Sequence, residues 1–370
     1  MRLLHMGDLH LGSAFTNFKS ATAARWRQGQ LDALSALLSQ SVSLGVELVL
    51  IAGDLFDTDK PDAALAYRVF SLLGELSVPV VIAPGNHDPY RRGGVWDTEL
   101  PENVYVFRRE EVSSFSFPEL GVTVYGYAFC SAEHAAPVLP SAAERGEEVG
   151  ILLAHADFGV SVSSYAPLSA QALEQSGFAY AALGHVHRPE PARRVGKTTV
   201  SYCGFFAGRG FDETGAGGAR MVEIADGAVK VTSVESGANR FLLLPVDCTG
   251  AESGDELRDL VRSALATLSP DEHTAVRAVL CGEVVADCTP DTYLLSRLGQ
   301  GFAHFEVKDE TLPLYDVARL MKDPTLMGAF YRAMQPRLQS EDEEERLLAT
   351  QALRLGLAVL MGREVAYAAD

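Results

Sequence analysis

Five short clusters of polar residues contain the side chains that proteins use to bind divalent metals. The clusters are Asp8-Leu9-His10, Gly53-Asp54, Gly85-Asn86-His87-Asp88, His155-Ala156-Asp157 and Gly184-His185-Val186-His187. Carboxylate and imidazole ligands together suit manganese, iron or zinc. A carboxylate such as that of Asp54 can bridge two ions, because it has two oxygens and several lone pairs. The pattern predicts a two-metal site whose candidate residues are Asp8, His10, Asp54, Asn86, His155, His185 and His187.

Two metal ions at such a site would support phosphoester hydrolysis. Ions roughly 3.5–4 Å apart clamp the attacking and leaving oxygens of an in-line phosphoryl displacement, and they acidify water near neutral pH. Each cluster taken alone is an ordinary loop, turn or strand end. All five together, each directly after an apolar segment, favour the hydrolytic interpretation over five unrelated turns.

The clusters share one structural setting, because each follows a short, continuous apolar run. These runs cover residues 2–6, 47–52, 79–84, 150–154 and 180–184. Such runs are typical of strands buried on both faces, and helical stretches lie between some of them, at 26–44 and 63–76. Ligands of open α/β sheets bind beyond the carboxyl ends of the strands. Glycine precedes three clusters, at Gly7, Gly53 and Gly85, where it allows the backbone to turn sharply.

The length of 370 residues is too great for one compact core and suggests two or three domains. A glycine-rich stretch, 204–218, leads to two more strands, and the first domain is predicted to end at 239. Residues 240–311 then read as a small α/β domain, in which a helix is expected to start at Thr289-Pro290. Residues 312–370 are predicted to form a C-terminal helical segment, whose second helix starts at Ser340.

Composition indicates a soluble globular protein, with 47% apolar and 22% charged residues. No apolar run reaches the ~18 residues that a membrane span needs, so no membrane association is expected. The N-terminus turns polar after about six residues, unlike a signal peptide. Five scattered cysteines, without a Cys-x-x-Cys pair, fit reduced thiols. We therefore expect a cytoplasmic location.

The net charge of −18 argues against a nucleic-acid binder, which is usually basic. Salt screens exposed charges beyond roughly 8–10 Å, however, so the local charge near a site outweighs the total. Two divalent ions would bring four positive charges, whereas Asp8 and Asp54 supply two negative ones. The site itself is therefore expected to be cationic.

Together the five clusters resemble the signature of the calcineurin-like metallophosphoesterases, over about residues 1–205. The resemblance implies a β-sandwich flanked by helices. It also implies one metal held by Asp8, His10, Asp54 and His187, and another held by Asp54, Asn86, His155 and His185. In that family the histidine after the asparagine, here His87, protonates the leaving oxygen. The acid that often pairs with it is here Asp57.

A closer resemblance is to the SbcD-type DNA repair nucleases, including their YhaO-like bacterial branch. It is carried by 9–13, 53–57, 86–90 and 184–189, and by the α/β domain that follows, where these nucleases have a capping domain. This chain departs from the pattern of these nucleases at two places, which bear on the substrate and not on the metal ligands. Archaeal and eukaryotic relatives commonly have His where this chain has Asp57. The segment that usually reads Pro-Gly-Ser or Pro-Gly-Asn in these nucleases is Cys203-Gly204-Phe205 in this chain.

This resemblance implies a metal-dependent DNA exo- or endonuclease in DNA repair, with manganese favoured and iron, magnesium or zinc as alternatives. The implied partners are DNA and an SbcC-like coiled-coil ATPase, bound through helices after the capping domain, and a homodimer is left open. Two other functions share the same residues. One is a phosphodiesterase for small molecules such as cyclic nucleotides. The other is a non-catalytic docking subunit, which would not need the proton donor His87.

Weaker candidates lie outside the ligand set. Arg91, Arg92 and Arg209 could bind phosphate, and Tyr90 could stack on a base, although a solvated loop explains them at least as well. His5 lies inside a strand and is expected to be a core histidine. Apolar residues of the tail suit either internal packing or a partner surface. They are Leu347, Leu348, Leu355, Leu357, Leu360 and Met361.

Overall fold

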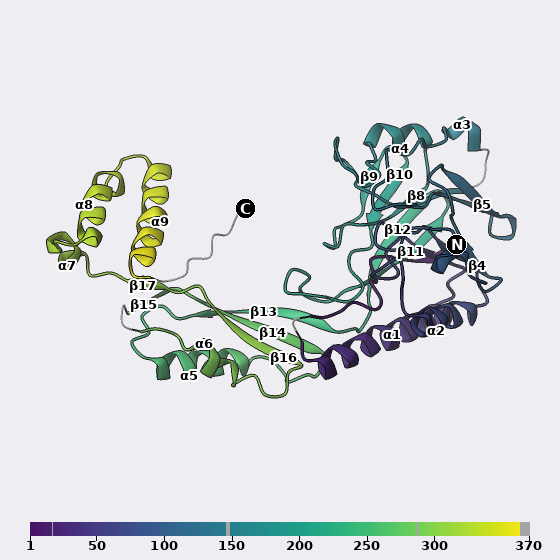
Figure 1. Ribbon diagram of the computed structural model, residues 1–370. Helices are drawn as coiled ribbons and strands as arrows, with labels where there is room; N and C mark the ends of the chain where they lie inside the picture. Colours follow the sequence, from purple (N-terminus) through teal and green to yellow (C-terminus); the bar gives the residue numbers. More distant parts are fainter. Residues whose placement is uncertain (17, 146–148, 286–287, 363–370) are drawn as a thin grey trace. The chain divides into compact units, whose positions relative to one another are not determined.

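The computed structural model describes residues 1–16, 18–145, 149–285 and 288–362 (Figure 1). It separates into two compact units, Met1–Phe241 and Leu242–Asp370. Within the described residues, no helix is both long enough and apolar enough to cross a membrane.

The first unit contains two six-stranded sheets. In spatial order, the first sheet consists of β12 (Ala228–Glu235), β11 (Gly218–Ala225), β1 (Arg2–Met6), β2 (Leu48–Ile51), β3 (Val80–Ile82) and β4 (Val104–Val106). The second consists of β5 (Ser113–Phe117), β6 (Val122–Gly126), β7 (Val149–His155), β8 (Tyr180–Gly184), β10 (Thr198–Tyr202) and β9 (Arg193–Val195). Strands β1 to β4 are parallel to one another, as are β6, β7, β8 and β10.

The two sheets pack face to face because their apolar strands have side chains on both faces. Leu3 and Leu50 of the first sheet share a buried cluster with Ile151 and Tyr180 of the second. Alternate residues, such as Leu4, point to the opposite face. That face packs against α1 (Ser20–Ser43) and α2 (Ala63–Gly74).

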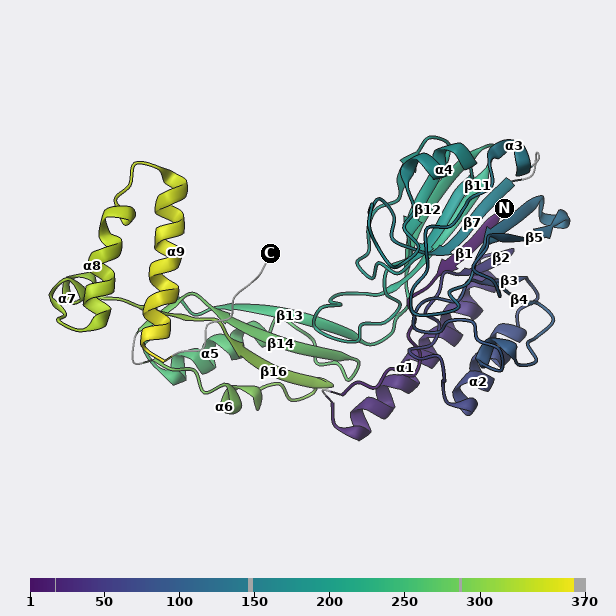
Figure 2. The same ribbon diagram turned by 45° about the horizontal axis from the view of Figure 1, so that its top comes forward.

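The outer face of the second sheet is covered in the same way. There Leu152 and Leu183 pack with Leu173 of α4 (Ala170–Ser176). Figure 1 and Figure 2 show this order of layers, with α1 and α2 beside one sheet and α4 beside the other. A further short helix, α3, spans Ala142–Arg145, and two 3-10 turns span Val95–Asp97 and Pro118–Leu120. The predicted α/β class, a β-sandwich flanked by helices, is confirmed.

The second unit has a smaller α/β core followed by helices. Its sheets contain β13 (Arg240–Asp247), β14 (Thr274–Cys281) and β16 (His304–Asp309), and separately β15 (Glu283–Val285) and β17 (Leu312–Leu314). Its helices are α5 (Gly254–Leu265), α6 (Thr292–Ser296), α7 (Val317–Lys322), α8 (Leu326–Leu338) and α9 (Glu343–Leu360). Leu257 and Val261 of α5 are buried against Val276 and Leu280 of β14.

Two helices of this unit begin at residues other than those predicted from the sequence. Helix α6 begins at Thr292 with Asp291 as its N-cap, and not at Thr289-Pro290, because the Asp291 carboxylate accepts the amide hydrogen of Leu294. Helix α9 begins at Glu343, where Asp342 caps the amide of Glu344. The division of this unit into a capping domain and a helical segment stays a prediction.

The imidazole of His5 is enclosed between the two sheets of the first unit. Its Nδ1 lies 2.8 Å from the hydroxyl of Tyr180, and its Nε2 has no hydrogen-bond partner among the described residues. Burial, aided by the charge of Arg220, lowers the pKa of His5 from 6.5 to about 3. His5 is therefore neutral in the native protein.

We expect His5 to make the protein sensitive to acid. The unfolded chain protonates this imidazole below its ordinary pKa and the native chain does not, so stability is lost as the pH falls from 6.5 towards 3. The loss is ~1.4 kcal/mol per pH unit, or about 2 kcal/mol at pH 5. His5→Gln should lack this component when urea unfolding of the metal-free protein is compared at pH 7.5 and pH 5. An equal loss in both proteins would contradict the assignment.

Candidate metal centre

The seven predicted ligands meet at the carboxyl ends of parallel strands from both sheets. Asp8 and His10 follow β1, whereas His155 is the last residue of β7. The strand ends are tied together by main-chain hydrogen bonds. The amide of Asp8 donates to the carbonyl of Gly53 (3.0 Å), and that of His10 to the carbonyl of Asp54 (2.9 Å). The amide of His185, after β8, donates to both oxygens of the Asp8 carboxylate at 3.0 Å.

One group consists of Asp8, His10, Asp54 and His187. One ligand atom from each of these residues lies within 4.8 Å of the others. His10 Nε2 is 3.2 Å from His187 Nε2 and 3.5 Å from Asp54 Oδ2. His187 Nε2 is 3.8 Å from Asp8 Oδ1. We call these four residues the first ligand group.

A second ligand group consists of Asp54, Asn86, His155 and His185. His155 Nε2 lies 2.8 Å from Asn86 Oδ1, 3.3 Å from His185 Nδ1 and 3.5 Å from Asp54 Oδ2. The same oxygen of Asp54 is therefore 3.5 Å from a ring nitrogen of His10 and from one of His155. Asp54 stands between the groups, where a bridging carboxylate belongs.

Each of the four histidines has its other ring nitrogen held by an oxygen. His10 Nδ1 contacts Asp57 Oδ1 at 3.1 Å, and His187 Nδ1 contacts Glu213 Oε1 at 2.7 Å. His155 Nδ1 donates to the carbonyl of Ala52 at 3.0 Å, and His185 Nε2 lies 3.4 Å from Asp157 Oδ1. Such partners fix the tautomer and the ring orientation of metal-ligating histidines.

This arrangement of donor atoms fits cations. A carboxylate only accepts hydrogen bonds, so Nδ1 of His10 and of His187 carries the proton in the neutral ring, and their Nε2 lone pairs then face each other across 3.2 Å. Two such lone pairs repel unless a positive charge lies between them. Asp8 and Asp54 are also buried, each with 1% of its surface exposed. Buried carboxylates are stable when they are paired or coordinate metals.

The ionisation of the two buried carboxylates differs. Burial raises the pKa of Asp8 to about 6, although the neighbouring His187 acts in the opposite direction. Burial also acts to raise the pKa of Asp54, but His155 and His10 outweigh it and hold this pKa below its ordinary value. Asp54 is accordingly favoured as the anion.

The backbone at these positions is strained. Asp8, His10 and Asp54 have φ of 48°, 45° and 50°, in the left-handed region that non-glycine residues rarely adopt. Such strain costs of the order of 1–3 kcal/mol per residue and clusters at functional sites. Gly85 is required for a different reason: a Cβ atom there would lie 2.2 Å from Asp54 Oδ1.

The exposed side chain of His87 borders the first ligand group. Its amide donates to Asp54 Oδ1 at 3.0 Å, and its ring meets that of His10 edge-on, with centroids 4.7 Å apart. An oxygen of the Asp57 carboxylate lies within 4.8 Å of a ring nitrogen of His87 and of one of His10. His87 Nδ1 lies 3.4 Å from the main-chain carbonyl of Asp57, while the carboxylate of Asp57 holds His10.

Three acidic residues near the ligands were not predicted from the sequence to have a role. Asp88 is fully buried and accepts amide hydrogens from Gly85 (2.8 Å), Phe56 (3.1 Å) and Asp54 (3.2 Å). It thereby joins the loops after β2 and β3. Asp157 and Glu213 contact His185 and His187 as described above. The signal for Asp88 and Asp157 was their place inside the clusters, whereas Glu213 lies in a glycine-rich stretch without one.

The weaker candidates from the sequence mostly have internal partners. Arg91 pairs with Asp59 at 3.3 Å, and the hydroxyl of Tyr90 donates to Asp97 at 3.2 Å. Arg209 contacts Glu213 and Asp57. The phosphate-binding role considered for Arg91 and Arg209 therefore competes with ion pairs already formed.

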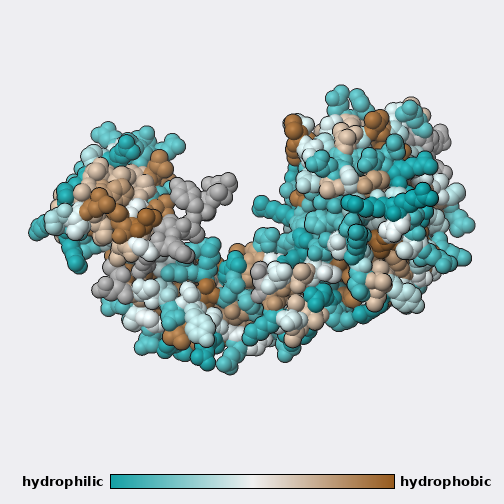
Figure 3. Space-filling model, viewed as in Figure 1, coloured by the Kyte–Doolittle hydropathy of each residue, from teal (hydrophilic) through white to brown (hydrophobic). Residues whose placement is uncertain are grey.

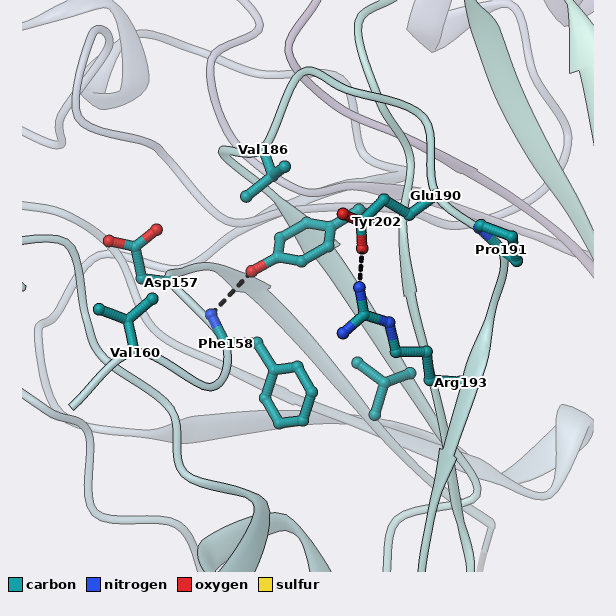
Figure 4. Close-up of a pocket in the computed structure, with 9 residues that line it drawn as sticks. Asp157, Phe158, Val160, Val186, Glu190, Pro191, Arg193 and Tyr202 are labelled. Atoms are coloured by element: carbon teal, nitrogen blue, oxygen red, sulfur yellow. Dashed lines mark hydrogen bonds and ion pairs between the residues drawn. The ribbon is translucent and has the colours of Figure 1, made fainter. Parts of the chain in front are cut away.

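A cavity of about 130 Å³ is drawn in Figure 4. Asp157, which contacts His185, forms part of its wall together with Val186. The hydroxyl of Tyr202 donates to the carbonyl of Ala156 (2.9 Å) and accepts the amide hydrogen of Phe158 (2.7 Å). These bonds fix the loop after β7, and with it Asp157.

We predict that the chain binds two manganese ions. Elemental analysis after saturation with manganese and desalting should give two ions per chain. His155→Ala should remove one ion and leave the other partly bound, because His155 belongs to the second ligand group alone. His273→Ala, at an exposed position of the second unit, is the control and should keep both. One ion at saturating manganese in the unsubstituted protein would contradict a two-metal centre.

Comparison with known proteins identifies a family of phosphoesterases. The family model of the calcineurin-like phosphoesterases matches residues 1–189. The uncharacterized metallophosphoesterase YhaO of Bacillus subtilis (strain 168) is 27% identical over 296 residues, which cover 76% of this chain and 72% of that protein.

Two archaeal proteins are also similar. The DNA double-strand break repair protein Mre11 of Methanopyrus kandleri is 28% identical over 288 residues, covering 71% of this chain and 62% of that protein. Mre11 of Haloferax volcanii is 26% identical over 274 residues, covering 70% and 58%. The similarity thus spans less than two thirds of either archaeal protein. With its family model matched over half of the sequence, and carboxylate and imidazole donors gathered at the strand ends, this chain belongs to the calcineurin-like phosphoesterase family and is a phosphodiester hydrolase.

Proposed function

We propose that this chain is a DNA nuclease that uses two divalent ions, manganese being favoured, and that it acts in DNA repair. The observation that carries the proposal is the position of Asp54 Oδ2, 3.5 Å from a nitrogen of each ligand group. It supports a bridged pair of ions, which is the arrangement suited to in-line displacement at phosphorus. The choice of DNA is supported by the similarity to two proteins named for double-strand break repair.

Asp8, His10, Asp54 and His187 would hold one ion, and Asp54, Asn86, His155 and His185 the other. When bound, the ions neutralise charge on the phosphate oxygens and activate water. His87 supplies the proton for the leaving oxygen. Its Nδ1 faces the Asp57 carbonyl, so Nε2 is the atom that points to the substrate. Because the His87 amide is anchored on Asp54, the proton donor keeps its position relative to the metal ligands.

Asp57 acts on His10 in this proposal. Its carboxylate lies 3.1 Å from His10 Nδ1, which directs Nε2 of His10 towards the first ligand group. Asp57 would thereby support metal binding, and its orienting effect on the proton donor His87, whose ring nitrogen lies within 4.8 Å, stays a prediction.

Because the chain is acidic overall, DNA binding would depend on the positive charge of the metal centre. With a net charge of −18, long-range attraction to a polyanion is unfavourable. The bound ions, rather than a basic surface, would supply the local positive charge. A small-molecule phosphodiesterase would use the same ligands, and the direct comparison of substrates below separates the two functions.

The C-terminal helices have both an internal core and exposed apolar residues. Leu357 of α9 is fully buried with Leu320 and Tyr331, whereas Leu347 and Leu348 are 61% and 65% exposed. Apolar surface is visible on these helices at the left of Figure 3. We propose that this exposed surface binds an SbcC-like coiled-coil ATPase, since an amphipathic helix commonly docks in a partner groove. A homodimer stays a prediction.

The first test is whether the purified chain degrades DNA when manganese is supplied. We expect DNA cleavage at a rate above that of bis-p-nitrophenyl phosphate hydrolysis. His87→Ala should lower turnover by ~10²–10⁴-fold, the usual worth of general acid catalysis, while both manganese ions stay bound. Hydrolysis of the small ester without any DNA cleavage would favour the small-molecule function. Cleavage by His87→Ala at the full rate would remove His87 as the acid.

The partner surface is tested by charge substitution at exposed positions. Leu347→Glu with Leu348→Glu should leave the melting temperature and the phosphodiesterase rate unchanged, and should abolish retention by the immobilised coiled coil of the ATPase. Leu357→Glu, at a buried position, is the contrasting variant and should unfold the helical segment. Retention of the ATPase by the double variant would show that this surface is not the docking site.

A further inference from the structure

Arg209 connects the two carboxylates that hold the histidines of the first ligand group. Its Nη1 lies 3.3 Å from Asp57 Oδ1, and its Nη2 lies 2.7 Å from Glu213 Oε1. Asp57 in turn contacts His10, and Glu213 contacts His187. The contacts form one continuous chain, His10–Asp57–Arg209–Glu213–His187, whose two ends are the metal-facing imidazoles. Nη2 of Arg209 also lies 3.0 Å from Nδ1 of His187, so it contacts one of these imidazoles directly.

The geometry around Glu213 is tightly specified. Nε of Arg209 lies 3.1 Å from Oε1 of Glu213, and the main-chain amide of Arg209 donates to Oε2 at 2.9 Å. A two-nitrogen contact of this kind fixes direction as well as distance, because the guanidinium is planar. The Glu213 side chain is only 5% exposed. Rotation of Glu213 would therefore break several bonds at once.

Three features distinguish Arg209 from a residue that binds substrate phosphate. All three of its guanidinium nitrogens already contact carboxylate oxygens. Its charge is balanced by two acids, Asp57 and Glu213. Its side chain is 24% exposed, so most of it lies inside the protein. The residue is better placed to orient other groups than to contact a polyanion.

The second ligand group is supported differently. His155 is held by a main-chain carbonyl, that of Ala52. His185 is held by Asp157, whose side chain is 19% exposed, across 3.4 Å. The contact between His187 and Glu213 is shorter, at 2.7 Å, and its acid is only 5% exposed, although His187 is 27% exposed. Asp57, Arg209 and Glu213 thus support the histidines of the first ligand group as one connected set, whereas each histidine of the second group has a separate support.

We infer that Arg209 is a positioning residue for the first metal ion and that this ion binds more tightly than the second. The guanidinium keeps Asp57 and Glu213 in place, and these keep Nε2 of His10 and His187 directed at one point. The inference rests on the proposed two-metal centre but not on the identity of the substrate. Outer partners of ligating histidines typically change metal affinity by ~10–100-fold when they are removed.

Manganese titration of Arg209→Gln tests the inference. Calorimetry and the electron paramagnetic resonance signal of bound manganese should resolve a tighter and a weaker ion in the unsubstituted protein. In the variant, the tighter ion should lose ~10–100-fold in affinity, and the weaker one should change little. Hydrolysis of bis-p-nitrophenyl phosphate should then return to nearly the full maximal rate at high manganese.

Two further variants sharpen the comparison. Arg209→Lys should be intermediate, because an ammonium is a point charge that cannot reproduce the planar contact with both acids. Arg2→Gln is the matched control. It removes another arginine that contacts a single carboxylate oxygen through two nitrogens, that of Glu223 at 2.8 and 3.1 Å, at the opposite end of β1. It should keep both manganese affinities.

The inference is overturned if Arg209→Gln binds both ions as the unsubstituted protein does. It is also overturned if the variant stays inactive with both ions bound, since Arg209 would then contact substrate. Should Arg209→Gln fail to fold, Asp57→Asn and Glu213→Gln replace it, and each must weaken the same ion. Because the titration needs no substrate, a lack of DNA cleavage would defeat the proposed nuclease function and leave this result intact.

Discussion

The structure of the first unit depends on one constraint. The carboxylate of Asp54 must lie between imidazoles that come from different sheets. His10 follows β1 of the first sheet and His155 ends β7 of the second, yet a nitrogen of each lies 3.5 Å from the same oxygen. This requires the two sheets to be aligned so that their strands end at the same level. Buried side chains between the sheets, such as Leu50 and Ile151, provide that alignment.

Local strain is the consequence of this placement. Asp8, His10 and Asp54 all adopt positive φ, and Gly85 must lack a side chain so that Asp54 can fit. Hydrogen bonds between the loops offset the strain. Asp88 accepts three main-chain amide hydrogens and thereby fixes the loops after β2 and β3. A buried carboxylate with no ligand role of its own thus determines where the bridging ligand sits.

The electrostatics of the site are local and differ from those of the whole chain. The sequence has 49 acidic and 31 basic residues, and two of the acidic ones, Asp8 and Asp54, are buried among the candidate ligands. Within the site, imidazoles stabilise Asp54, and Arg209 compensates Asp57 and Glu213. Glu213 illustrates the balance: burial would raise its pKa, but hydrogen bonds from His187 and Arg209 lower it to about 2. The charges within the site are therefore balanced locally, although the net charge of the chain is unfavourable for binding a polyanion.

The sequence by itself determined which strands carry the clusters and which residue types lie at their ends. Continuous apolar runs and the polar residues that follow them are local patterns, so buried strands and a common location for Asp8 and His155 could be predicted from them, whereas the β-sandwich was implied by the family resemblance. Helix starts were less accurate: Asp291, rather than Thr289, caps α6, because the choice among neighbouring caps depends on packing. Strands such as β9 and β10, which carry no cluster, were not predicted.

Only the tertiary structure decided the partners of the ligands. Glu213 is 26 residues from His187, and Arg209 is 152 residues from Asp57. No local periodicity encodes contacts at such separations, since they exist only once both sheets and the glycine-rich stretch have packed. The same reason explains why the contact of the Asp57 carboxylate with His10, across 47 residues of sequence, was not predicted. A motif specifies that an acid is present, whereas the path of the backbone around it decides which imidazole the acid can reach.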